Sequence, residues 1–170
     1  EGEPSGTEID SIAATYYKIL TDEGLLAVPD DFEFKDSIEL GVADFYRIKY
    51  ENQPFRAVHF NRLHKYAFEF MKKQIQKEGK KVVVTHHLPS ELCNAKEFKG
   101  SMINEAFCVD KTDFIAKSDI NYWIYGHSHR NMAEIDINNT KLVTNQLGYV
   151  GYSEHLNFKR DSYFEILNHD

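Results

Sequence analysis

The stretch of sequence that decides the fold is Lys81-Val82-Val83-Val84-Thr85-His86-His87-Leu88-Pro89. Its β-branched residues over 81–85 show no alternation of apolar and polar side chains, which predicts a strand buried on both faces beside covering helices. Ahead of it, an apolar stripe at helical spacing predicts an amphipathic helix over 61–78 that ends at Gly79. A helix followed by a buried strand indicates α/β layering.

The same order recurs further along the chain. A short helical segment over 111–117 precedes a second predicted strand over 122–125, which ends at Gly126. Two further runs, 133–137 and 141–144, flank Asn138-Asn139 and predict a β-hairpin, and 163–167 predicts a last strand. Near the beginning, residues 7–23 predict a helix, whereas the pattern over 36–50 is ambiguous. We expect one layered α/β domain.

Bulk properties exclude several classes of protein. The chain has 170 residues and a net charge of −7, which disfavours a broad nucleic-acid-binding surface. Its two cysteines, Cys93 and Cys108, form no metal or disulfide framework, so we expect a reducing, cytoplasmic location. No apolar run approaches the ~18 residues of a membrane span. The first residue is Glu1 and no signal peptide follows it, which is consistent with a missing N-terminal part.

Four of the eight histidines follow the two predicted buried strands. His86-His87 comes after the first strand, and Gly126-His127-Ser128-His129 comes after the second. Ligands of open α/β sheets bind beyond the carboxyl ends of the strands, where we expect Gly126 to permit a sharp turn. Imidazoles from two such loops can surround one metal ion or bridge two. The alternative is a hydrogen-bonded loop histidine, which is the interpretation we favour for the remaining four. Those four are His59, His64, His155 and His169.

These two stretches resemble signatures of a known family. Residues 82–89, a buried strand that delivers a histidine shortly before Pro89, resemble the fourth signature of calcineurin-like metallophosphoesterases. Residues 122–129 resemble the fifth signature, Gly-His-x-His, and Asn145-Gln146-Leu147-Gly148-Tyr149 is also similar to many members. The resemblance implies a layered α/β sandwich, of which residues 36–167 would form the C-terminal half. Residues 1–35 match no part of the family.

The resemblance also implies roles for individual residues. His86 and His127 would bind the metal that also takes an asparagine, and His129 would bind the other. His87 would contact the phosphate or protonate the leaving group; a hydrogen-bonded supporting role is the alternative. Arg130 and Asn131 would either touch substrate or belong to a solvated loop. The implied cofactors are two divalent transition metal ions, drawn from Mn, Fe, Zn or Ni.

Three earlier signatures of the family are missing from this sequence. They are Asp-x-His, Gly-Asp-x-x-Asp and Gly-Asn-His-Asp/Glu, which supply the bridging aspartate and the asparagine; Asn168-His169-Asp170 lacks the glycine and comes at the wrong end. We therefore expect a partial metal-dependent phosphoesterase acting on a phosphate monoester or diester, associated with an N-terminal fragment or a second copy of the chain. The alternative is a non-catalytic scaffold or binding module with the same fold. A closed structural zinc site is poorly supported, because neither cysteine neighbours the histidines.

Overall fold

The computed structural model of the chain describes residues 34–101 and 103–166. The predicted helix over 7–23 lies outside these residues. The chain forms two compact units, and each is described by itself. The first contains residues 34–68, 97–101 and 103–106, and the second contains residues 69–96 and 107–166. Their division was not foreseen from the sequence, in which no linker composition marks a boundary.

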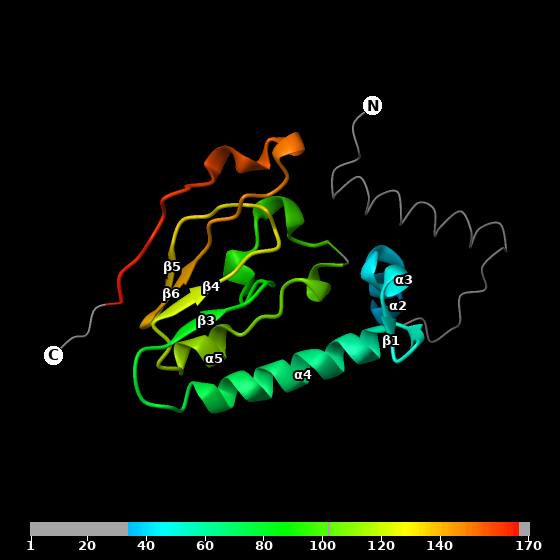
Figure 1. Ribbon diagram of the computed structural model, residues 1–170, viewed down its shortest axis with the longest axis horizontal. Helices are drawn as coiled ribbons and strands as arrows, with labels where there is room; N and C mark the ends of the chain where they lie inside the picture. Colours follow the sequence, from blue (N-terminus) through cyan, green and yellow to red (C-terminus); the bar gives the residue numbers. More distant parts are fainter. Residues whose placement is uncertain (1–33, 102, 167–170) are drawn as a thin grey trace. The chain divides into compact units, whose positions relative to one another are not determined.

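The second unit is built on a four-stranded mixed sheet (Figure 1). Its strands are β3 (Val82–Val84), β4 (Tyr122–Ile124), β5 (Ile135–Ile137) and β6 (Thr140–Val143), in the spatial order β3-β4-β6-β5. β3 and β6 run parallel to β4, whereas β5 pairs antiparallel with β6. The connection between β3 and β4 contains α5 (Thr112–Ala116). The predicted α/β class is therefore correct.

One face of this sheet carries the core. Val83, Trp123 and Leu142 stand side by side on β3, β4 and β6, and all are buried. Ile115 of α5 and Ile120 belong to the same cluster, and both are fully buried. Because the register aligns these three strands residue by residue, their alternate side chains share one face, as the period of two in a strand requires. The interior therefore includes β3 and β4, the two strands that precede the histidine loops.

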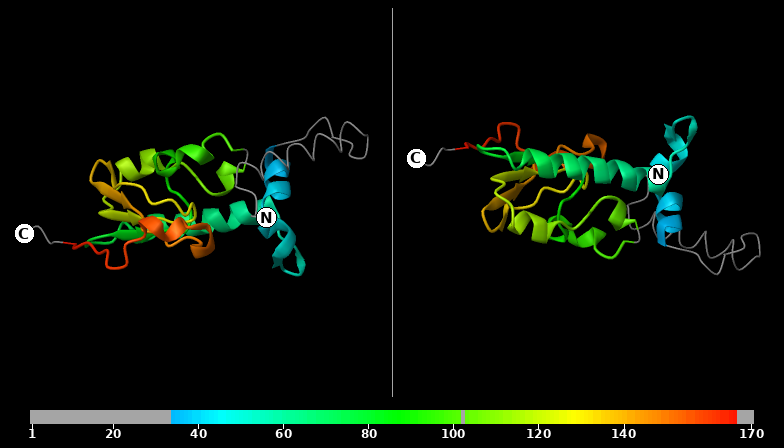
Figure 2. Two further views of the ribbon diagram at one scale, coloured as in Figure 1. Left: turned by 90° about the horizontal axis from the view of Figure 1, so that it is seen from above. Right: turned by 90° about the horizontal axis from the view of Figure 1, so that it is seen from below.

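The other face of the sheet is less covered, which corrects the prediction of a strand buried on both faces. β3 lies at the edge of the sheet, and only Val83 is buried, while 37% of Val82 and 69% of Val84 are exposed. Figure 2 shows α5 and the chain after residue 150 on opposite sides of the sheet. The sequence of a three-residue apolar strand cannot show whether one or both of its faces are buried, because the run of apolar residues is the same in the two cases.

The loops around the sheet test two further predictions. The hairpin is confirmed: β5 and β6 pair in antiparallel register across Asn138, whose φ of 51° is the left-handed conformation that asparagine tolerates. The predicted last strand is wrong within the described residues 163–166, which form no strand. Phe164 instead stacks on Tyr122 of β4 with ring centroids 4.1 Å apart. This segment therefore packs through a side chain rather than through a backbone ladder.

The first unit contains the region that the sequence left unassigned. It holds α2 (Phe34–Gly41), α3 (Asp44–Arg47), β1 (Lys49–Tyr50), β2 (Gln53–Pro54) and the first part of α4 (Ala57–Gln74). Phe45 and Phe55 are buried and stack with ring centroids 5.7 Å apart. Elements of two to eight residues joined by tight turns leave no sustained hydrophobic period, which explains why the pattern was ambiguous.

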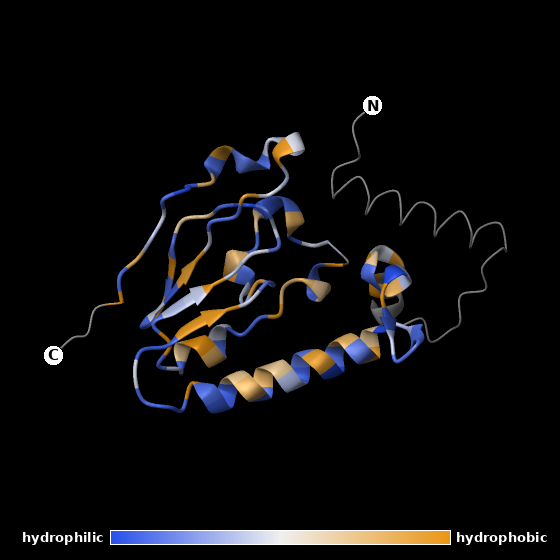
Figure 3. Ribbon diagram, in the orientation of Figure 1, coloured by the Kyte–Doolittle hydropathy of each residue, from blue (hydrophilic) through white to orange (hydrophobic). Residues whose placement is uncertain are grey.

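The amphipathic helix predicted over 61–78 is present as α4, which begins and ends four residues earlier. Its early start follows from tertiary contact, because Glu39 Oε1 accepts a hydrogen bond from the backbone N–H of Ala57 at 2.7 Å. Figure 3 shows apolar and polar residues alternating along its length. Within residues 34–101 and 103–166, no helix combines the length and apolarity needed to cross a bilayer.

The remaining described elements are 3-10 turns that connect the helices and strands. They are η1 (Glu91–Cys93), η2 (Lys96–Phe98), η3 (Asn104–Ala106), η4 (Val150–Tyr152) and η5 (Glu154–Asn157). η1 begins where the Ser90 hydroxyl accepts a hydrogen bond from the backbone N–H of Leu92 at 3.1 Å. η4 and η5 follow the histidine loop, and η5 places the acidic side chain of Glu154 against it.

Candidate metal centre

The parallel pairing of β3 and β4 brings the two histidine pairs to one edge of the sheet. Val84 is aligned with Ile124, so both strands end at the same level. The backbone N–H of Thr85 donates to the carbonyl of Ile124 at 2.9 Å, and the N–H of Gly126 donates to the carbonyl of His86 at 3.1 Å. These bonds continue the ladder beyond the strands and hold the two loops together. The expected convergence at the carboxyl ends of the strands is thus observed.

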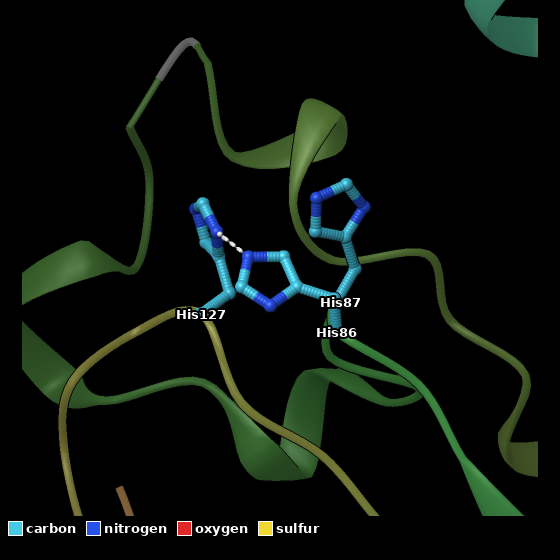
Figure 4. A group of neighbouring side chains, drawn as sticks. All are labelled: His86, His87 and His127. Carbon is cyan, nitrogen blue, oxygen red and sulfur yellow. Dashed lines mark hydrogen bonds between the residues drawn. The ribbon is translucent and has the colours of Figure 1, made fainter. Parts of the chain in front are cut away.

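Three histidines gather at this edge, and Figure 4 shows them as sticks. One ring nitrogen from each of His86, His87 and His127 lies within 4.8 Å of the others. Nδ1 of His127 lies 3.1 Å from Nε2 of His86, so one of these nitrogens donates and the other accepts. The ring centroids of His87 and His127 are 5.1 Å apart. Two loops therefore direct three imidazoles into one small volume.

An aromatic ring partly encloses this cluster. Phe107 stacks on His127 with centroids 4.1 Å apart and meets the ring of His87 edge-on at 5.8 Å. Burial, together with the nearby imidazoles of His87, His86 and His129, lowers the pKa of His127 to about 4. The imidazole of His127 is neutral at pH 7, which is the form that binds metals. Phe107 was not singled out from the sequence, because it lies in a loop with no motif of its own.

The loop after β4 is held in an uncommon backbone conformation. His127 and His129 have φ values of 71° and 51°, in the left-handed region that costs a residue with a side chain ~1–3 kcal/mol. Gly126 has no such positive φ, so the left-handed conformation of this loop lies at the two histidines rather than at the glycine. The two histidines therefore carry the positive φ values of this loop.

Gln146 is the residue that holds this loop in place. Its Oε1 accepts the backbone N–H of His129 at 2.7 Å, and its Nε2 donates to the Arg130 carbonyl at 3.0 Å. Nε2 also lies 3.2 Å from Ser128 Oγ. Asn131 supports Gln146 in turn, by donating to its carbonyl at 2.8 Å and accepting from its N–H at 2.6 Å. The sequence had marked 145–149 only by resemblance; its physical role is to brace the histidine loop.

His129 lies apart from the three-histidine cluster. Its Nδ1 is 2.9 Å from Glu154 Oε2, and the same oxygen accepts the backbone N–H of Tyr149 at 2.6 Å. Arg130 Nη1 approaches the other carboxylate oxygen at 3.2 Å. Burial works against ionisation of Glu154, but these hydrogen bonds outweigh it and lower the pKa of the carboxyl. The structure thus places His86 and His127 together with His87, and it places His129 beside a carboxylate.

Glu154 fits against His129 because Gly148 leaves room for it. Gly148 has a φ of 64°, and a Cβ there would lie 2.6 Å from the Cβ of Glu154 and 3.2 Å from that of His129. A side chain at this position would therefore force the acidic residue away. Sequence reasoning missed Glu154, since it lies 25 residues from His129 and belongs to no acidic signature. Only the packing of η4 and η5 against the loop reveals it.

The cluster contains no carboxylate within the described part of the chain. Among residues 34–101 and 103–166, its members are three histidines, without an aspartate, glutamate or cysteine at comparable distance. The two cysteines are both free and buried, and neither belongs to the cluster. Three imidazoles bring no negative charge to offset a divalent ion. The donor set nevertheless suits a transition metal with an open coordination position, as in three-histidine zinc sites.

We compared the chain with known proteins. Protein-family models, curated proteins and solved structures were all searched, and none of them matches this chain. The site must therefore be interpreted from its own residues.

Proposed function

We propose that this chain is a metal-dependent phosphoesterase in partial form, which hydrolyses a phosphate monoester or diester with metal-activated water. The observation that carries the proposal is the convergence of His86, His87 and His127 at the carboxyl ends of β3 and β4. The resemblance of residues 82–89 and 122–129 to metallophosphoesterase signatures supports it independently of the geometry. Together they favour phosphate-ester hydrolysis over other uses of a histidine cluster.

The residues present fit a divalent transition metal. His86 and His127 would hold the ion, because their facing nitrogens are 3.1 Å apart and an ion inserted between them would replace their mutual hydrogen bond. A bound divalent ion would supply Lewis-acid polarisation of a phosphate oxygen and a more acidic water. Mn, Fe, Zn and Ni all accept imidazole ligands.

His87 and His129 would have other roles. His87 has a ring nitrogen within 4.8 Å of those of His86 and His127. It would act either as a third metal ligand or as the group that protonates the leaving oxygen. Phe107 excludes water from one side of His87 and His127, which strengthens electrostatic interactions there. If His129 binds a second ion, as the resemblance implies, it would use Nε2, because Nδ1 is paired with Glu154.

A non-catalytic scaffold with the same fold is the second candidate function. The observation that favours it is the cluster's lack of carboxylates among the described residues, because dinuclear phosphoesterases need a negatively charged bridge between their ions. A partner polypeptide could supply the missing carboxylates. The exposed Val82 and Val84 at the edge of the sheet are where we expect an N-terminal fragment or a second copy to pack.

Metal-dependent hydrolysis is the direct test. We would measure release of the alcohol from an aryl phosphate and an aryl phosphodiester with and without Mn²⁺, for the native chain, His127→Ala and His64→Ala. His64 is exposed on α4 and is the matched control. We expect hydrolysis that requires Mn²⁺, disappears in His127→Ala and persists in His64→Ala. Hydrolysis that survives His127→Ala would contradict the metal mechanism, and Mn²⁺ binding without hydrolysis would favour the scaffold.

Association is tested separately by size-exclusion chromatography and intact mass of the purified chain. We expect a dimer or a complex with a second polypeptide. A stable lone monomer would overturn the expectation that the sheet edge is covered by a partner.

A further inference from the structure

Exposed apolar side chains lie close together in the chain just after the histidine loop. Between residues 147 and 156, five large apolar side chains have exposed fractions from 49% to 74%, and they are Leu147, Tyr149, Val150, Tyr152 and Leu156. All five belong to the second unit. Contiguous apolar patches are uncommon on the surfaces of monomeric proteins, and where they occur they mark binding sites. This stretch is therefore a candidate ligand-binding surface.

The rings of Tyr149 and Tyr152 give this surface a defined shape, which we call the aromatic corner. Their centroids are 6.0 Å apart, and their planes are inclined at 80°. A planar group that stacks on one of two nearly perpendicular rings meets the edge of the other, and both contacts are favourable between aromatic groups. Tyr149 is 61% exposed and Tyr152 is 53% exposed, so a ligand can reach both residues.

Backbone hydrogen bonds hold the aromatic corner in position. The N–H of Tyr149 donates to Glu154 Oε2 at 2.6 Å, and the N–H of Glu154 donates to the carbonyl of Tyr149 at 3.3 Å. The N–H of Tyr152 donates to the same carbonyl at 3.1 Å. Ser153 completes the turn in the left-handed conformation, with a φ of 60°. Because the backbone that carries both rings is fixed before a ligand arrives, binding requires little further ordering.

The aromatic corner adjoins the candidate metal centre. The ring of Tyr149 meets the ring of His129 edge-on, with centroids 4.6 Å apart. His129 follows His127 by two residues, and two residues of chain span at most ~7 Å. His127 in turn belongs to the cluster with His86 and His87. The corner therefore lies within reach of a small substrate whose phosphate is held at the cluster.

The dimensions of the aromatic corner favour a small planar group over a protein partner. A stable protein interface takes ~800 Å² and ~20–30 residues from each side, whereas this surface comes from the ten residues 147–156. A long nucleic-acid strand is disfavoured by the net charge of −7. Aromatic side chains stack on a single base with little regard to its substituents, so two rings suffice to bind one planar ring system.

We propose that the aromatic corner formed by Tyr149 and Tyr152 binds a planar aromatic group in the alcohol part of the substrate. The chain then prefers phosphate esters of nucleosides or aryl-substituted alcohols to esters of aliphatic alcohols. The inference rests on the proposed function for the position of the phosphate, and it assigns the two tyrosines as residues that determine specificity. The shared chemistry is a planar ring system close to a phosphate group.

Binding of phosphonates tests this preference without hydrolysis, because a phosphonate has no ester bond to cleave. We would measure dissociation constants by isothermal titration calorimetry of the full chain with Mn²⁺. The ligands are benzylphosphonate, the phosphonate isostere of adenosine 5′-monophosphate, cyclohexylmethylphosphonate and methylphosphonate. We expect an aromatic ligand to bind at least ~10-fold more tightly than methylphosphonate and at least ~3-fold more tightly than cyclohexylmethylphosphonate, because stacking adds to apolar burial.

The four ligands also separate the possible occupants. Tighter binding of the adenosine isostere than of benzylphosphonate would identify a nucleoside, and the reverse would identify a simpler aryl group; either result supports the proposal. Cyclohexylmethylphosphonate that binds as tightly as both aromatic ligands would overturn it, because the surface would then be merely apolar. The absence of binding by any of the four ligands would also overturn it.

Substitutions separate the aromatic corner from the rest of the site. Tyr149→Ala and Tyr152→Ala should each reduce the preference for the aromatic ligand over methylphosphonate at least ~5-fold, while Tyr149→Phe retains it. Tyr163→Ala is the control, because Tyr163 is 82% exposed but adjoins Phe164, which stacks on Tyr122 at the other end of β4. A preference that survives both alanine variants would contradict the proposal. An equal loss of affinity for methylphosphonate would do the same, since it would show that the tyrosines only support the histidine loop.

Failure of this inference and failure of the phosphoesterase proposal give different results. Preferential binding of aromatic phosphonates without any Mn²⁺-dependent hydrolysis would leave the aromatic corner as a binding site and refute only the hydrolysis. Conversely, benzyl phosphate and cyclohexylmethyl phosphate have leaving alcohols of similar size. Hydrolysis of the two with equal kcat/KM would leave the phosphoesterase proposal intact and overturn the role of the aromatic corner.

Discussion

His127 and His129 lie two residues apart on one loop, both in the left-handed conformation, yet their surroundings differ in kind. His127 faces the imidazoles of His86 and His87 and stacks on the apolar ring of Phe107, and no carboxylate of the described residues belongs to this group. His129 faces the carboxylate of Glu154 and meets the ring of Tyr149 edge-on, with centroids 4.6 Å apart. The contrast teaches that identical residues with the same backbone conformation acquire different chemistry from what packs against them.

The difference decides what each imidazole can bind. Near His127 the facing ring nitrogens are close enough to share an ion, and the lowered pKa reduces competition from protons. At His129 one ring nitrogen is already occupied by Glu154, which fixes the orientation of the ring. The surroundings of His127 therefore favour binding a metal ion together with the neighbouring imidazoles. The surroundings of His129 favour an imidazole that is held in one orientation. Each prediction below alters one side of this contrast.

The largest effect is expected on metal affinity. His127→Ala should weaken binding of Co²⁺ by at least ~100-fold, because it removes one of three converging nitrogens, whereas His129→Ala should change it less than ~3-fold. The visible absorption of bound Co²⁺, titrated into the full chain, measures both. Equal losses in the two variants would show that the cluster extends to His129 when a metal binds.

The next effect is on stability. Gly148→Ala should lower the free energy of unfolding by ~2–3 kcal/mol, because its methyl group collides with Glu154 and its positive φ is strained. Gly79→Ala is the control: its φ of 98° is also positive, but no atom lies within 4 Å of the added Cβ. Urea unfolding measures both variants. A cost for Gly148→Ala no greater than that for Gly79→Ala would mean that Glu154 does not pack against the glycine.

A smaller effect is expected from Glu154→Gln. This change keeps the shape but removes the charge that accepts hydrogen bonds from His129, Arg130 and Tyr149, and should cost ~1 kcal/mol at pH 7. Because these bonds lower the pKa of the carboxyl, the native stabilisation is complete above the unfolded-state value of 4.5 and is lost as pH falls through the lower folded value. Chemical unfolding at pH 7 and pH 3 should therefore show a smaller difference between native and variant at pH 3 than at pH 7.

The smallest effect concerns protonation of the cluster. Phe107→Ala should raise the pKa of His127 from about 4 towards its ordinary value of 6.5, because water would reach the ring; the change should stay within ~10-fold in proton affinity. Tyr149→Ala, which removes the ring beside His129, should leave His127 unaffected. NMR titration of the imidazole protons follows both. An unchanged pKa in Phe107→Ala would mean that the neighbouring histidines, rather than burial, set it.

Much of the fold around the site could be predicted from the sequence. The predictions of α4, β3, β4, α5 and the hairpin around Asn138 are confirmed, because each has a local signal in the form of a period, a β-branched run or a turn residue. The elements of the first unit before α4 and the conformation of residues 163–166 could not be predicted, because short elements and single stacking contacts leave no periodic pattern.

The candidate site could likewise be predicted only in part from the sequence. Local sequence was enough to select the four histidines and to place both pairs beyond neighbouring strands. It was not enough to predict which three converge, because that depends on the left-handed turns at His127 and His129 and on the packing of Phe107. Nor could it reveal Glu154, whose partner lies 25 residues away.

The sequence by itself determined the elements that carry the histidines and the order in which they follow one another. The parallel pairing of β3 with β4 brings two loops together across some forty residues of chain, as the contact between His86 and His127 shows. Only the tertiary structure decided that His127 shares its space with imidazoles while His129 is held by a carboxylate. The physical reason is that hydrophobic period is a local property, whereas the neighbours of a side chain are set by packing between distant segments.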